Sequence, residues 1–192
     1  LKLGIGAVLY DPVDNALLFF GALVDPSIVA YWSGGGEKEM MIHQAELFPV
    51  FLPRTTWSSR LWRRRNLTFV DNDGARDCLI KGYSSVEPSG HILGAVGLAE
   101  NRLESDSWFT RVPSEGNIAD GPSRLEFKDV LALGGVECDI VFPSNWRANC
   151  APTFGIQWHW DVPGDPSVDQ PSLRQGKEFP PSYSPSPFLT GI

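Results

Sequence analysis

Residues 108–124 read WFTRVPSEGNIADGPSR, and this stretch decides the fold. Aromatic and β-branched side chains at residues 108–112 predict a strand, because they fit a pleated, half-buried surface. The Pro-Ser-Glu-Gly that follows predicts a loop, and Asn117 is a suitable cap for a short helix over residues 118–124. The pattern therefore sets the carboxylate of Asp120 at the start of a helix that follows a strand.

Two apolar runs near the beginning of the sequence, residues 3–10 and 16–24, are separated by Asp, Pro and Asn. These three residue types favour turns, so the two runs predict a β-hairpin. We expect a further strand near residues 27–32, before a run of three glycines.

The first long helix is expected over residues 37–61, where apolar side chains recur with helical spacing. Pro49 and Pro53 interrupt this pattern. Each proline removes a backbone donor and clashes with the carbonyl four residues earlier. We therefore expect a kink or an early stop just past Glu46.

The middle of the chain alternates between strand and helix signals. Residues 67–70 predict a short strand that ends at Asp71, and residues 75–81 predict a helix that Gly82 stops. A longer helix is expected over residues 91–103. The order of strands and helices predicts an α/β fold, in which a sheet and helices form packed layers.

The amino-acid composition of the sequence changes after residue 127. Residues 131–142 are apolar enough for one more strand or two, and residues 145–160 are dense in Trp. Residues 161–192 hold seven Pro, which predicts an irregular tail. We divide the chain into a domain, a Trp-rich extension and a Pro-rich tail, with bounds 1–127, 128–160 and 161–192.

The composition of the chain excludes some classes of function. The 192 residues carry 16 Lys and Arg against 23 Asp and Glu, a net charge of −7, which excludes a strongly basic nucleic-acid binder. The longest apolar runs reach about half of the roughly 20 residues that a membrane span needs, so no span is expected. The three cysteines have no paired spacing, which favours an intracellular reducing compartment, an organelle included.

Three acids stand out by position: Glu46 on the first long helix, Asp71 at the end of a strand and Asp120 at the start of the last helix. Carboxylates that converge from a helix and a strand end suit a pair of hard cations such as Mg²⁺. The alternative is that Asp simply caps helices and forms turns at such positions.

Three blocks carry a resemblance to a known family: His43-Gln-Ala-Glu-Leu47, Phe69-Val-Asp-Asn-Asp-Gly-Ala75 and the stretch 108–124. Residues 3–125 resemble the ribonuclease H-like domain of retroelement reverse transcriptases. The resemblance implies a mixed five-stranded sheet flanked by helices, here followed by an irregular Trp- and Pro-rich C-terminal extension. It also implies Mg²⁺-dependent cleavage of the RNA strand in RNA–DNA hybrids.

Glu46, Asp71 and Asp120 fall on catalytic, metal-binding carboxylates of that family. The family's first acid lies on a central opening strand, upstream of the segment that matches residues 4–9, and that strand is missing here. We expect its place to be filled by upstream residues, by residues 131–142 or by a strand from a partner. Without the first acid, metal should bind weakly and cleavage should be poor.

A second candidate site combines basic and aromatic side chains. Arg63, Arg64 and Arg65 follow Trp62, a pairing that suits backbone contact and base stacking on a nucleic acid. An equally good interpretation is a solvated helix end, where the arginines favour the helix dipole.

Two functions remain open at this point. In the first, the chain is a retroelement-derived, non-catalytic module that serves as a structural or interaction subunit of a larger assembly, with its Trp- and Pro-rich C-terminal third docking a protein partner. In the second, it is a fragment of an active Mg²⁺-dependent endoribonuclease that binds RNA–DNA hybrids. The first needs no cofactor, and the second needs Mg²⁺.

Overall fold

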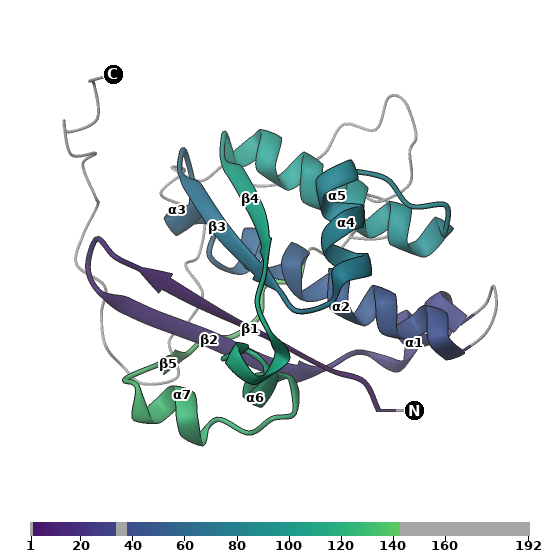
Figure 1. Cartoon of the computed structure of the whole chain (residues 1–192). Coiled ribbons are helices and arrows are strands. Elements are labelled where there is room, and N and C mark those ends of the chain that lie inside the picture. The colour runs from purple at the N-terminus through teal and green to yellow at the C-terminus, as the bar shows by residue number, and fades with distance from the viewer. Residues whose placement is uncertain (1, 34–37, 143–192) are drawn as a thin grey trace.

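The computed structural model describes residues 2–33 and 38–142 as a mixed α/β structure (Figure 1). Its strands are β1 (Gly4–Asp11), β2 (Ala16–Leu23), β3 (Arg65–Val70), β4 (Asp106–Arg111) and β5 (Val136–Glu137). Its helices are α1 (Pro26–Ser33), α2 (Lys38–Thr56), α3 (Ser58–Leu61), α4 (Asp73–Lys81), α5 (Glu87–Leu103), α6 (Asp120–Ser123) and α7 (Lys128–Ala132), with a 3₁₀ turn at Ser114–Gly116. None of the helices in these ranges is long and apolar enough to cross a membrane.

The strands form two separate sheets. β1 and β2 make the expected antiparallel hairpin, with Gly4 opposite Leu23, and β5 adds to β2 in parallel to give a small mixed sheet. β3 and β4 form a parallel pair in which Leu67 lies opposite Trp108. Within the described residues no strand joins β1 to β3, so the expected five-stranded sheet is divided into two parts (Figure 1).

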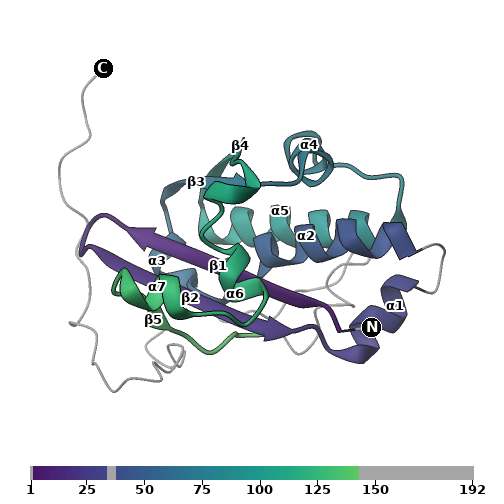
Figure 2. The same cartoon turned by 60° about the horizontal axis from the view of Figure 1, so that its bottom comes forward.

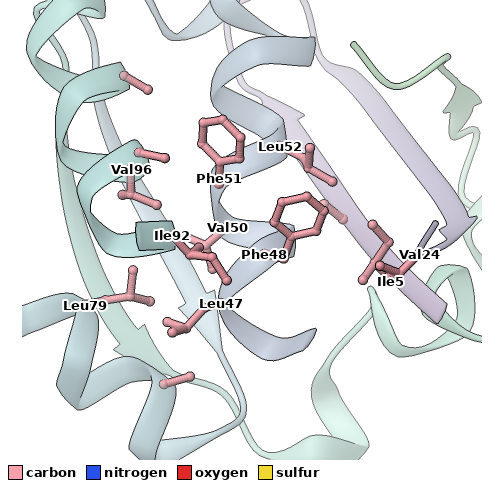
Figure 3. Packing of buried hydrophobic residues seen from close by; sticks show 14 of the residues in the cluster. Ile5, Val24, Leu47, Phe48, Val50, Phe51, Leu52, Leu79, Ile92 and Val96 are labelled. Atoms are coloured by element: carbon pink, nitrogen blue, oxygen red, sulfur yellow. The ribbon is translucent and has the colours of Figure 1, made fainter. Parts of the chain in front are cut away.

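Helix α2 is the centre of the hydrophobic core. It lies between α5 on one side and the β1–β2 hairpin on the other (Figure 3). Leu47, Phe48, Phe51 and Leu52 of α2 are each at most 1% exposed. The ring of Phe48 meets the ring of Trp32 edge-on, with centroids 5.4 Å apart. This burial of large side chains stabilises α2 and fixes where its remaining, polar residues lie.

The expected early stop of the first helix is wrong, because α2 runs unbroken from Lys38 to Thr56 with both Pro49 and Pro53 inside it. A proline in a helix interior costs roughly 3 kcal/mol. The burial of neighbouring side chains such as Phe48 offsets this cost. Both prolines, four residues apart, lie on the one face of α2 that borders the groove described below.

The expected strand at residues 27–32 is also wrong, since this segment forms helix α1. Pro26 is the first residue of the helix, a position where its missing N–H costs nothing. The carboxylate of Asp25 accepts a hydrogen bond from the N–H of Ser27 at 2.7 Å, which caps the helix. Buried Ile28 and Trp32, four residues apart, then face the core.

A close backbone approach joins α6 to the hairpin. A Cβ on Gly6 would lie 2.4 Å from the backbone nitrogen of Ser123, and one on Gly21 would lie 2.3 Å from the carbonyl oxygen of Pro122. Ile5 is fully buried, and Gly6, the next residue, faces the other side of the strand. The hairpin is therefore covered on both faces, by α2 and by α6 (Figure 2).

Residues 131–142 contain one strand, as their composition predicts, but it is short. The segment begins within α7, and Val136 and Glu137 form β5, which pairs with Leu18 and Phe19 at the outer edge of β2. This stretch is therefore not the missing central strand. The predictions for residues 145–160 and 161–192 lie outside the described residues.

Candidate functional site

A groove separates the two sheets. It runs between β1 and β3, is floored by α2 and encloses about 1220 Å³ of space between atoms, its open side included. Along its walls lie residues 4–9 of β1 and residues 66–70 of β3. Glu46, Asp71 and Asp120 all border this groove, so the structure brings the three predicted carboxylates together.

Each carboxylate is positioned by the element that carries it. Glu46 lies in the first half of α2, directly before buried Leu47. Asp71 follows the last residue of β3, and the Asn72 side chain caps α4 by accepting the N–H of Ala75 at 2.9 Å. Asp120 is the first residue of α6, the helix that packs on the hairpin glycines. Three elements that are distant in sequence therefore converge at one end of the groove.

The three acids interact electrostatically. The pKa of Glu46 is raised to about 7, chiefly by burial and then by the charge of nearby Asp71, by the hydrogen bond with Asp71 and by the charge of Asp120. The carboxyl of Glu46 therefore keeps its proton to a higher pH than an ordinary glutamate does. Like charges that share a poorly solvated site favour such proton retention.

Asn117 completes the site, and sequence patterns assigned it a different role. Its side-chain nitrogen donates to the Oδ2 atom of Asp71 at 2.9 Å, while its oxygen accepts the N–H of Ala119 at 3.0 Å. Asn117 was expected to cap a helix over residues 118–124, but α6 is confined to Asp120–Ser123. The side chain instead links Asp71 on β3 to the loop before α6.

The donor chemistry of the groove suits Mg²⁺, because carboxylate oxygens are the hard ligands that this ion prefers. Across residues 2–33 and 38–142, however, no three His, Cys, Asp or Glu side chains lie close enough together in this structure to hold one metal ion. Two of the acids also have other partners: Asp71 accepts from Asn117, and Asp120 pairs with Arg124 at 3.0 Å.

The second predicted site, Trp62 with Arg63, Arg64 and Arg65, lies where α3 leads into β3. The Arg63 guanidinium stacks over the ring of Trp62, 4.8 Å from its centroid. Each arginine also faces an acid, and these partners are Glu104 (2.7 Å), Asp11 (3.0 Å) and Asp106 (4.0 Å), in sequence order. The local positive charge is therefore offset by carboxylates.

A buried cation, Arg54, lies at the other end of the groove floor. Its side chain is 3% exposed and pairs with Glu100 of α5 at 2.6 Å. It also donates to the hydroxyl of Ser107 on β4 at 2.7 Å and lies over the ring of Phe109. Nothing in the sequence pattern singled out Arg54, because its partners are some 50 residues away. It ties α2 to α5 and β4, and the three acids lie at the opposite end of the groove.

Comparison of the chain with known proteins gave no match: no family model, no curated protein and no solved structure is similar to it.

Proposed function

We propose that this chain is a retroelement-derived, ribonuclease H-like module that acts without catalysis, as a structural or interaction subunit of a larger assembly. The observation that carries the proposal is the groove between β1 and β3. In the part of the chain that the structure describes, the two strands that border it have no strand on their facing edges, and an unpaired strand edge readily accepts another polypeptide. A subunit that completes its sheet on assembly would have such a surface.

The state of the carboxylates supports the non-catalytic role. A two-metal nuclease site needs ionised acids that share their charge with cations. Here the pKa of Glu46 is raised to about 7, and Asp71 hydrogen bonds to Glu46 as well as to Asn117. These contacts satisfy the acids within the protein.

The proposed partner is a protein that docks in part on the C-terminal third of the chain. The described beginning of that third, residues 128–142, exposes several large apolar side chains: Leu131 (45%), Leu133 (65%) and Phe142 (43%). Such residues close together in sequence provide apolar area for a protein interface.

A second function, Mg²⁺-dependent cleavage of RNA in RNA–DNA hybrids, is favoured by one observation. Glu46, Asp71 and Asp120 border the same groove, and the pKa of Glu46 is raised first by burial and then by the charges of Asp71 and Asp120. A divalent cation would relieve the repulsion between these charges. In this alternative, a further ligand from outside the described residues would have to complete the site.

A cleavage assay separates the two functions. The full chain is incubated with an RNA–DNA hybrid and Mg²⁺ or Mn²⁺, beside Asp71→Asn and a matched surface variant, Asp77→Asn on α4. We expect no cleavage above that of Asp71→Asn. Cleavage by the full chain and by Asp77→Asn that is lost in Asp71→Asn would overturn the non-catalytic proposal.

A further inference from the structure

The groove has two strand edges as its walls. β1 pairs with β2 along one edge and β3 pairs with β4 along one edge, and within the described ranges neither has a strand on its other edge. Pairing on one side uses only part of the N–H and C=O groups of a strand, so the remainder point toward the groove. Such groups are costly to bury without a hydrogen-bond partner, at about 1–3 kcal/mol each.

The two walls run in opposite directions. Asp11, at the end of β1, pairs with Arg64, which immediately precedes β3. At the opposite end, Gly6 meets α6, and Asp71 after β3 bonds to Asn117 just before α6. A strand laid between the walls is therefore antiparallel to one and parallel to the other, and both arrangements form regular ladders.

The groove has the size of one strand. Residues 4–9 of β1 and residues 66–70 of β3 border it, so each wall is five or six residues long. At a rise of about 3.3 Å per residue, an occupant of similar length would run along the whole of both walls.

The α2 side chains that floor the groove favour apolar side chains in a bound segment. Pro49, Val50, Pro53 and Trp57 of α2 and its C-terminal end border the groove. Side chains alternate across a strand, so every second residue of the occupant would face this floor and the others would face outward. An occupant with apolar residues at alternate positions fits.

The open face of β3–β4 indicates that the occupant belongs to a larger partner. Leu67 (57%), Phe69 (57%) and Trp108 (73%) are exposed on this face, although parallel strands are normally covered on both faces. A single added strand leaves most of this apolar surface in water, whereas a partner protein covers it. Residues 131–142 cannot serve, because β5 is engaged at the far edge of β2.

Charge selects against a nucleic acid. The end of the groove near α6 carries Glu46, Asp71 and Asp120, and the nearest cation, Arg124, already pairs with Asp120. A polyanion would be repelled from this end, whereas a peptide with a basic residue there would gain an ion pair.

We propose that the groove between β1 and β3 binds an extended segment of a partner protein as an added β-strand, with alternate apolar side chains on α2 and a basic residue beside Glu46, Asp71 and Asp120. This rests on the proposed role as a subunit, and it names the partner's binding mode. Strand addition derives its affinity from main-chain hydrogen bonds, so a peptide of generic alternating sequence can test it.

The test measures amide hydrogen exchange, residue by residue, in the full 192-residue chain. The probe is the capped peptide Lys-Thr-Val-Thr-Val-Thr-Val-Lys at millimolar concentration, and the control is the same peptide N-methylated at alternate residues. We expect the probe, and not the control, to slow exchange at least tenfold at amides of both β1 and β3.

A groove-filling variant, Ala45→Phe, should abolish the protection, since Ala45 borders the groove. Its matched control is Ile80→Phe, on the exposed side of α4, which should bind as the unaltered chain does. If circular dichroism shows that Ala45→Phe is unfolded, Ala45→Leu replaces it.

Three results would overturn the inference: no protection by the probe, equal protection by the N-methylated control, or protection of the same amides by an RNA–DNA hybrid. Full protection of both strand edges in the chain alone would also overturn it, because a segment of the same chain would then fill the groove. The cleavage assay is independent: a chain that neither cleaves nor binds the peptide fails this inference alone.

Discussion

The two strand pairs differ in how completely they are covered. The β1–β2 hairpin has α2 on one face and α6 on the other, and Ile5, Phe19 and Phe20 are at most 1% exposed. The β3–β4 pair has its helices on one face (Figure 2), and on its other face Leu67, Phe69 and Trp108 are exposed. Within the described residues, the hairpin is thus covered on both faces, whereas β3–β4 is covered on one. The groove lies where the two regions meet.

The largest difference in stability that we expect is between two Phe→Ala substitutions, one beside the hairpin and one on β3–β4. Phe48 is fully buried beneath the hairpin side of α2, so Phe48→Ala should lower the free energy of unfolding by about 3–5 kcal/mol. Phe69 on β3 is 57% exposed, and Phe69→Ala should change it by no more than about 0.5 kcal/mol. Urea denaturation followed by circular dichroism measures both. Equal losses would mean that the face of β3–β4 is already covered.

A smaller loss of stability is expected when a single methyl group is added to the hairpin. Gly6→Ala places a Cβ 2.4 Å from the backbone nitrogen of Ser123, so α6 must move away, at a cost of about 2–3 kcal/mol. The matched control is Gly94→Ala on α5, where no atom lies within 4 Å of an added Cβ. That change should instead stabilise the protein by about 0.5–1 kcal/mol. If Gly6→Ala is as stable as the unaltered chain, α6 does not pack on the hairpin as described.

The smallest effect concerns the groove between the two regions and depends on pH. Glu46 has a pKa of about 7 in the folded protein, above the value of about 4.5 in an unfolded chain. The folded state therefore binds more protons between these two values, and the free energy of unfolding falls as pH rises through this window. After screening by solvent, the loss should be about 1–2 kcal/mol.

Glu46→Gln removes this titration. The variant should lose the fall in stability between pH 5 and pH 8, and at pH 8 it should be at least as stable as the unaltered chain. Chemical denaturation at the two pH values measures this, with Glu115→Gln in the exposed 3₁₀ turn as the control. A fall in stability that persists in Glu46→Gln would mean that another group carries the pH dependence.

Local sequence patterns correctly predicted the elements that depend on short-range signals, such as turn residues. The turn residues between two apolar runs predicted the hairpin, Gly82 with φ +63° ends α4 as expected, and the strand at residues 108–112 is β4 at Asp106–Arg111. The positions of Glu46 on a helix, Asp71 at a strand end and Asp120 at a helix start also predicted that the three acids could converge. These features depend on short-range chemistry, which a single sequence contains.

Features that depend on distant contacts were not predictable in this way. Burial keeps α2 helical through Pro49 and Pro53, and the burial of Ile28 and Trp32 in the core favours α1 over the strand predicted at residues 27–32. The carboxylates that face Arg63, Arg64 and Arg65 come from other elements, including Asp11 at the end of β1. The hydrogen bond from Asn117 to Asp71 likewise joins residues 46 positions apart.

The division of the sheet is the central claim, and backbone nuclear Overhauser contacts in the free, isotope-labelled chain test it most directly. We predict cross-strand contacts along β1–β2, such as Val8 with Phe19, and along β3–β4, such as Leu67 with Trp108. We predict none between residues 4–9 and residues 66–70. Cross-strand contacts that join these last two segments would show a continuous sheet and contradict the account.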